Sequence, residues 1–124
     1  MRLFKTKSFA RFAKKAGIGD SELRGAVDAA ERGLVAADLG GGVIKQRIAR
    51  RGKGKSGGFR TLIVFRLGTR AVFVHGFAKS AQDNVAADEL VALKMLAAEL
   101  LAYDDKDIAR AVESGILLEV KRNG

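Results

Sequence analysis

The residues best suited to chemistry in this 124-residue chain lie in one stretch, "RRGKGKSGGFRT", residues 50–61. It combines four glycines with five cations and has no carboxylate; the cations are Arg50, Arg51, Lys53, Lys55 and Arg60. Lys45 and Arg47 precede it closely. Lysine and arginine bind phosphate oxygens through charged hydrogen bonds, and glycine lets the backbone approach a ligand. The stretch therefore predicts a site for a polyanion.

Other site chemistries do not fit the residues present. A nucleotide-binding P-loop needs a glycine five residues before its Gly-Lys pair, and here that position is Ala49. The loop also lies between two predicted strands, whereas a P-loop opens a helix. The chain has no cysteine and a single histidine, His75, which argues against thiolate metal sites and catalytic triads. Its carboxylates cluster in predicted C-terminal helices as solvated faces.

The charge is unevenly distributed. The net charge is +9; residues 1–80 contain 18 Lys/Arg against 5 Asp/Glu, and residues 81–124 contain 5 against 9. This asymmetry favours nucleic acid as the partner, with simple solubility as the alternative. A membrane surface is less favoured, because no basic amphipathic helix carries large exposed apolar residues. No apolar run approaches the ~20 residues of a membrane span, and we expect a cytoplasmic protein.

The first third of the chain predicts a short strand and two helices. Residues 2–5 form the strand, and a helix over 7–16 ends at Gly17. Asp20 is expected to cap the second helix. The apolar stripe of that helix is expected to be Leu23, Val27, Ala30 and Leu34.

The rest of the chain predicts a sheet followed by two helices. A turn at "DLGGG" is followed by strands at 43–50, 61–67 and 71–75, the last two joined by a type II′ turn at Gly68-Thr69. A helix at 85–102 is capped by Asn84 or Asp83. A shorter helix begins after Asp104 or Asp105 and ends at Gly115. The apolar run 116–120 is either a last strand or an edge that docks on a partner. Together these elements predict one α+β domain: a small antiparallel sheet packed against helices on one side.

Antiparallel pairing of strands 61–67 and 71–75 would bring His75 and Lys79 towards Arg60 and the basic loop. Such a cluster suits RNA cleavage, which needs a base for the 2′-hydroxyl, positive charge at the phosphorane and an acid for the 5′-oxygen. A lysine crowded by other cations has a lowered pKa and can transfer protons. Arginine stays charged and grips phosphate at two points.

Two segments carry a resemblance to a known family. They are "GGVIKQRIARRGKGKSGGFRTLIVFR" and "AVFVHGFAKSAQDNVAADELVALKMLA". They resemble the RelE/ParE toxin superfamily, most closely RelE-type toxins with a "GKSGG-aromatic-R-T" loop and a "GFAKS…N" segment. The likeness covers roughly residues 1–100. It implies one RelE-like domain over 1–124, with 103–124 as a C-terminal helix and tail.

The resemblance also implies a function. The family member would be the toxin of a type II toxin–antitoxin system, cutting mRNA on the ribosome by 2′-hydroxyl attack without metal or cofactor. Its partners would be mRNA, the ribosome and a cognate antitoxin, often of the helix-turn-helix type. Two alternatives stay open: a ParE-like DNA gyrase inhibitor and a non-catalytic nucleic-acid-binding module. The apolar tail and the acidic helices are candidate antitoxin contacts.

The resemblance assigns roles to individual residues. Lys53 and Lys55 would contact phosphate and transfer protons, Arg60 would stabilise transition-state charge, and Lys79 would contact the phosphate or the leaving oxygen. Predicted RNA contacts are Arg47, Arg50, Arg51, His75 and Asn84. Many relatives use a tyrosine near the C-terminus. The only tyrosine here, Tyr103, cannot be matched to it, and His75 is a candidate substitute.

Overall fold

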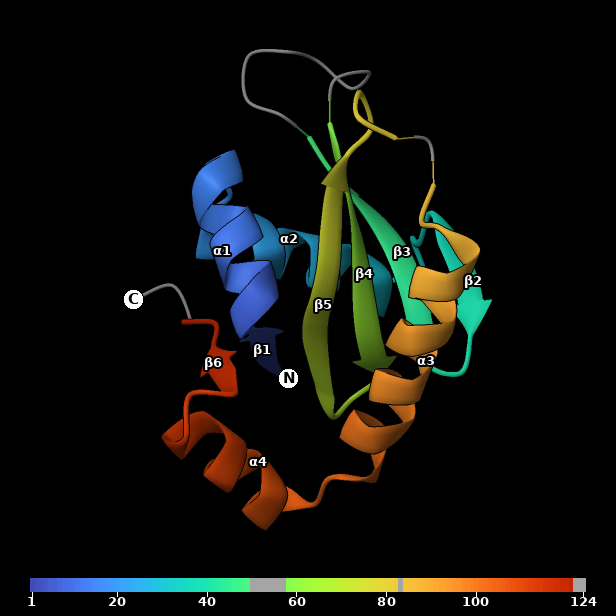
Figure 1. The fold of residues 1–124 in the computed structure, drawn as a ribbon. Helices are drawn as coiled ribbons and strands as arrows, with labels where there is room; N and C mark the ends of the chain where they lie inside the picture. Colours follow the sequence, from blue (N-terminus) through green and yellow to red (C-terminus); the bar gives the residue numbers. More distant parts are fainter. Residues whose placement is uncertain (50–57, 83, 122–124) are drawn as a thin grey trace.

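The computed structural model describes residues 1–49, 58–82 and 84–121. Its strands form one sheet in the order β2-β3-β4-β5-β1-β6 (Figure 1). The strands are β1 (Arg2–Thr6), β2 (Ala37–Gly40), β3 (Val43–Ile48), β4 (Phe59–Arg66), β5 (Arg70–Ala78) and β6 (Leu117–Glu119). The helices are α1 (Lys7–Ala16), α2 (Asp20–Glu31), α3 (Ala87–Ala102) and α4 (Asp105–Glu113). All neighbouring strands are antiparallel except β1 and β5, which are parallel. The predicted α+β class is confirmed.

Helices cover both faces of the sheet, so the prediction of helices on one side is wrong. One core cluster joins the sheet to α1 and α2, and a second joins its other face to α3 and α4 (Figure 1). β4 shows why: Ile63 belongs to the first cluster and Leu62 and Val64 to the second, and all are buried. A strand buried on both faces is apolar throughout, without alternation.

The two N-terminal helices differ in how well the sequence predicted them. α1 has the predicted bounds, and Gly17 ends it in the left-handed region with φ of +74°. Gly19, rather than Asp20, is the N-cap of α2. Leu34 lies beyond the end of α2 and is 61% exposed, so its predicted core position is wrong.

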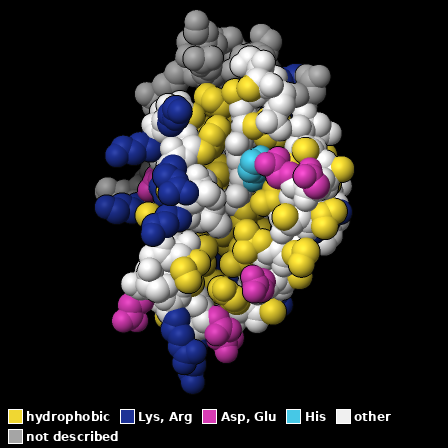
Figure 2. Space-filling model, viewed as in Figure 1, with side chains coloured by type: hydrophobic (Ala, Val, Ile, Leu, Met, Phe, Trp, Pro, Cys, Tyr) yellow, Lys and Arg dark blue, Asp and Glu magenta, His cyan; other side chains and the backbone are white. Residues whose placement is uncertain are grey.

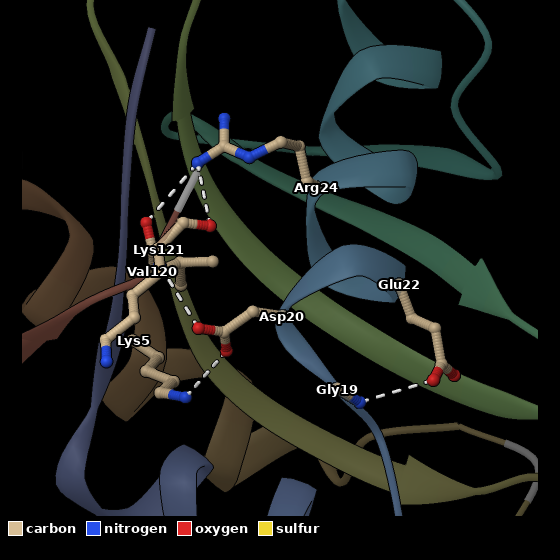
Figure 3. A network of polar contacts seen from close by, with 7 residues as sticks. All are labelled: Lys5, Gly19, Asp20, Glu22, Arg24, Val120 and Lys121. Atoms are coloured by element: carbon tan, nitrogen blue, oxygen red, sulfur yellow. Dashed lines mark hydrogen bonds and ion pairs between the residues drawn. The ribbon is translucent and has the colours of Figure 1, made fainter. Parts of the chain in front are cut away.

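The Asp20 side chain instead forms hydrogen bonds that link α2 to distant parts of the chain (Figure 3). Its carboxylate accepts hydrogen bonds from the Lys5 ammonium at 3.1 Å and from the Lys121 N–H at 3.1 Å. Arg24 adds bonds to the carbonyls of Val120 and Lys121. The network therefore joins the start of α2 to β1 and to the chain following β6.

The β4–β5 hairpin forms as predicted, but its turn differs. Arg66 pairs with Arg70, so the loop has three residues, and Gly68 is at its centre with φ of +77°. The Thr69 N–H bonds the Arg66 carbonyl at 3.0 Å, which puts Gly68 at the second central position of that turn. A type II′ turn needs glycine at the first central position.

Of the caps predicted for the two C-terminal helices, the one for α4 is confirmed and the Asn84 cap for α3 is wrong. α3 begins at Ala87 after Ala86, and the Asn84 side chain accepts from the adjacent Val85 N–H, so the predicted Asn84 cap is wrong. Asp83 lies outside the described residues. Asp104 caps α4 through the Asp107 N–H, as predicted.

The apolar run at 116–120 contains the last strand and is only partly buried, since Ile116 and Leu118 are 59% and 38% exposed. β6 pairs with β1, and Leu117 and Val120 are buried. The strand β2 was not predicted, because the "DLGGG" pattern indicated a turn there. In the described ranges, none of the helices combines the length and hydropathy needed to cross a bilayer.

Candidate nucleic-acid interface

Arg47 and Arg60 lie directly opposite each other on β3 and β4. Side chains alternate along a strand, so Arg60 shares the sheet face of Leu62, which packs in the α3-side cluster. Lys45 lies two residues before Arg47 and pairs with Leu62. Adjacent strands therefore bring three cations to one face at one end of the sheet.

Arg60 is a buried cation without a carboxylate. It is 6% exposed, and within the described residues its side chain makes one hydrogen bond, from Nη1 to the carbonyl of neighbouring Phe59 at 3.5 Å. Among the described residues no ion pair reaches it. Its pKa is lowered because burial removes water from the guanidinium and because Arg47 adds a second positive charge. An unpaired buried charge is costly to the fold, and such residues cluster at functional sites.

Arg70 provides a contrast within the same hairpin. It is 8% exposed, and its guanidinium donates to the backbone carbonyls of Leu100 and Tyr103 at the end of α3. The Leu100 carbonyl also accepts from the Tyr103 N–H, and the negative C-terminal end of a helix favours a cation. Arg70 thus binds carbonyls of a distant helix end, whereas the only side-chain hydrogen bond of Arg60 within the described residues goes to its neighbour Phe59.

A pocket of about 300 Å³ lies beside the two arginines, lined by Arg47, Ile48, Ala49, Gly58 and Arg60. Gly58 makes this geometry possible: a Cβ there would come within 2.8 Å of the Ile48 carbonyl oxygen. The Gly58 carbonyl accepts a hydrogen bond from the Lys79 N–H at 3.2 Å. One small residue therefore brings the ends of β3, β4 and β5 together.

The backbone of Lys79 and of His75 lies near the start of β4, as predicted. Lys79 is exposed and follows β5 directly, next to Gly58. His75 pairs with Leu62, two residues along β4 from Arg60. Its Nε2 lies 3.4 Å from a carboxylate oxygen of Glu89 in the first turn of α3. An RNA contact by His75 stays a prediction.

Several predicted site residues cannot be placed. Arg50, Arg51, Lys53 and Lys55 lie outside the described residues. Asn84 is described and exposed, and its side chain bonds Val85. No group of three or more His, Asp or Glu side chains that could hold a metal ion occurs within 1–49, 58–82 and 84–121.

Tyr103 lies at the other end of the sheet. Its carbonyl binds Arg70, the partner of Arg66 at the β4–β5 turn. Arg60 is six residues earlier on β4, a distance of roughly 20 Å at the usual rise per residue. The side chain of Tyr103 packs against the α3-side core. Tyr103 is therefore remote from the arginine pocket.

A second positive surface was missed at the sequence level. Figure 2 shows Lys and Arg side chains gathered over α1. The exposed cations of this helix are Lys7, Arg11, Lys14 and Lys15. Their spacing of four, three and one residues puts them on one helix face, and that periodicity was the available signal. α1 packs on the sheet face opposite Arg60.

The chain was compared with known families and proteins. The family model described as the RelE toxin of the RelE/RelB toxin–antitoxin system matches residues 1–120. Among curated proteins, none matched the chain. The match extends from β1 through β6 and therefore includes both the arginine pocket and the α1 surface. On this evidence the chain belongs to the RelE toxin family, and its expected partner is an antitoxin.

Proposed function

We propose that this toxin is an endoribonuclease that cuts mRNA on the ribosome. The observation that carries the proposal is the Arg47–Arg60 pair: two cations face each other beside a pocket, and one of them is buried with no carboxylate partner in the described part of the chain. A bound phosphodiester would supply the negative charge that Arg60 does not receive from any described carboxylate. Family membership supports a toxin, and the pocket suggests the substrate class.

The proposed reaction is an internal transfer. The 2′-oxygen loses its proton to a base and attacks the adjacent phosphorus, while the bond from phosphorus to the 5′-oxygen breaks. The leaving 5′-oxygen takes a proton from a general acid, so the products are a 2′,3′-cyclic phosphate and a 5′-hydroxyl. In this scheme Arg60 stabilises charge on the phosphorane, and Arg47 binds an adjoining phosphate. Lys53, Lys55 and Lys79 are the proposed groups for proton transfer and phosphate contact.

The α1 surface supports a ribosome-bound substrate over free mRNA. Its cations lie on the sheet face opposite Arg60, so one single strand in the pocket would leave them uncovered. A large folded RNA presents phosphates over a wide surface. We propose that α1 contacts ribosomal RNA while the pocket takes the mRNA.

The test maps RNA ends in cells and in a reconstituted translation reaction. Wild type is expected to leave new mRNA ends with cyclic phosphates. Arg60→Ala should reduce cleavage by roughly 10²-fold or more, the size of effect typical when one charge-stabilising donor is lost. Arg66→Ala is the matched control: it changes an exposed arginine at the far end of the same strand.

Two outcomes would count against the proposal. Arrested growth with intact mRNA and altered DNA supercoiling would indicate a gyrase inhibitor. Salt-dependent RNA binding by a protein that is harmless in cells would indicate a non-catalytic binding module. Thermal unfolding of each variant separates a lost function from a lost fold.

A further inference from the structure

A bulge in β5 puts His75, the only histidine of the chain, on the sheet face of the two pocket arginines. Leu62 pairs with His75 and Ile63 pairs with Phe73, so Val74 is an extra residue in β5. Phe73 packs on the α1 side, and strict alternation from Phe73 would put His75 on that side too. The extra residue instead places it opposite Leu62, on the α3 side. Bulges of this kind often re-aim a side chain next to an active site.

The residues that follow the bulge agree with this orientation. A Cβ at Gly76 would collide with the Phe12 ring of α1, so the side-chain direction of Gly76 is towards α1. Its neighbours His75 and Phe77 therefore point to the other face, where their ring centroids lie 6.0 Å apart. Phe77 pairs with Arg60. His75 and Arg60 are thus diagonal neighbours on one face, roughly 7–8 Å apart in a regular pair of strands.

The two ring nitrogens of His75 have different surroundings. Nε2 is enclosed by protein atoms and lies 3.4 Å from a carboxylate oxygen of Glu89, in the first turn of α3. That contact is an ion pair when the ring is protonated, but its geometry is too poor for a hydrogen bond, so Nε2 has no hydrogen-bond partner among the described residues. Nδ1 is not enclosed in this way, and the side chain as a whole is 24% exposed. A ligand on this face can therefore reach Nδ1.

Glu89 can complete the missing hydrogen bond by a small rotation. Its side chain is 44% exposed, so protein atoms do not hold the carboxylate tightly. Hydrogen bonds of catalytic groups are often long in a free enzyme and tighten when substrate binds. An Nε2–H that donates to Glu89 leaves the lone pair on Nδ1, because a neutral imidazole carries one N–H. The carboxylate also stabilises the charged ring after proton uptake.

We propose that His75 is the general base of the cleavage reaction and that Glu89 positions it. This inference rests on the proposed ribonuclease function and deepens it. Nδ1 takes the proton of the 2′-hydroxyl, the 2′-oxygen bonds to phosphorus, and the bond from phosphorus to the 5′-oxygen breaks. The leaving oxygen takes a proton from one of the lysines proposed for proton transfer, while Arg60 stabilises the phosphorane. Water then removes the proton from His75.

The pH dependence of cleavage should report the state of this ring. Histidine ordinarily changes charge between about pH 5 and 8, and a base acts only in its neutral form. The charged groups placed beside the ring by the described residues are Glu89 on α3 and Arg60 on β4. The α1 residues that line the adjoining pocket of about 200 Å³ are uncharged: Ser8, Phe9 and Phe12. Cleavage by the wild type should therefore slow at mildly acidic pH.

The experiment measures single-turnover cleavage of mRNA on ribosomes from mildly acidic to mildly alkaline pH. His75→Ala should slow cleavage by roughly 10²-fold or more, the usual contribution of a general base. His75→Gln keeps the polarity of the side chain but cannot act as a base at these pH values, so it should be equally slow. Both variants should lose the acid-side decline, and added imidazole should partly restore His75→Ala. Binding of an mRNA with a 2′-deoxy group at the cleavage site should change little.

Glu89 variants test the positioning role. Glu89→Ala should slow cleavage by roughly tenfold or more, the value of one hydrogen bond to a charged group. Glu89→Gln keeps an acceptor at the same length and should recover part of this loss. Asp88→Asn is the matched control, because Asp88 is an exposed acidic residue in the same helical turn. It should cleave at the wild-type rate, and thermal unfolding of each variant reports whether the fold is intact.

The assignment of the base is wrong if wild type cleaves mRNA and both His75 variants cleave as fast. It is also wrong if these variants are slow only because they are unfolded, keep the acid-side decline and gain nothing from imidazole. In both cases a slow Arg60→Ala would leave the ribonuclease function standing. If wild type leaves mRNA intact, the ribonuclease function and the assignment of the base are both wrong.

Discussion

Arg47 and Arg60 face each other across β3 and β4, and neither forms an ion pair with a carboxylate among the described residues. Two positive charges on neighbouring strands repel each other and destabilise the sheet. The arrangement is understandable if the missing charge comes from a ligand. A bound phosphate, or an antitoxin carboxylate, would turn this repulsion into attraction.

The exposed member of the pair should govern the salt dependence of RNA binding. Arg47→Ala is expected to make the slope of log K against log salt concentration less steep by roughly 0.7, one phosphate contact on a single strand. Fluorescence titration of a single-stranded RNA measures the slope. Arg66→Ala should change it less. Equal slopes for wild type and Arg47→Ala would remove Arg47 from the interface.

The α1 surface should control association with ribosomes. Changing Lys7, Arg11, Lys14 and Lys15 together to glutamine removes four exposed charges and leaves the buried face of the helix intact. Co-sedimentation with ribosomes is expected to fall by at least about tenfold at moderate salt. Binding of a short RNA in the arginine pocket should change little. Unaltered co-sedimentation would show that α1 does not contact the ribosome.

Gly58 should tolerate no side chain without loss of activity. In Gly58→Ala the new Cβ would stand 2.8 Å from the Ile48 carbonyl oxygen, and both are fixed by the sheet. Overpacking of this kind typically costs about 1–3 kcal/mol, and the ends of β3 and β4 would separate. Thermal unfolding and RNA cleavage should both decline. Gly25→Ala is the control, because its Cβ meets nothing and alanine favours the helix.

Tyr103 should not take part in catalysis. Tyr103→Phe keeps the ring in the α3-side core and keeps the backbone carbonyl that binds Arg70. Cleavage rates of the variant and the wild type should therefore agree within about twofold, far below the ~10²-fold typical of a lost general acid or base. A loss of that larger size would place the phenol at the reaction centre.

Asp20 should make stability depend on pH. Burial raises the pKa of this carboxyl, but hydrogen bonds from the Lys121 N–H and Lys5, together with their charges, lower it overall. A lowered pKa in the folded state stabilises the protein above the unfolded value of about 3.9. That contribution is lost as pH falls through the folded-state pKa.

Urea unfolding of Asp20→Asn across pH measures this contribution. The variant should be less stable than wild type by about 1 kcal/mol at pH 7, because hydrogen bonds to a charged group are replaced by weaker ones. The difference should shrink at acidic pH, once the wild-type carboxyl is protonated. A difference that does not vary with pH would mean that the network acts through packing and not through charge.

Local patterns determined much of this protein. The helical periodicity and Gly17 fixed α1, the Asp104 cap fixed the start of α4, and the β-branched runs fixed the β4–β5 hairpin. These features depend on neighbours within a few residues, so their signals lie in the sequence. The motifs around Gly58 and Lys79 carried the family likeness, which the family match confirms.

Only the tertiary structure decided which residues face each other. The pairing of Arg47 with Arg60 depends on strand register, and a shift of one residue would move each side chain to the opposite face. Burial of Arg60, exposure of Leu34 and the remoteness of Tyr103 likewise follow from packing between distant segments. Helices cover both faces because the strands are apolar on both sides, and that pairing of layers is set by the whole chain.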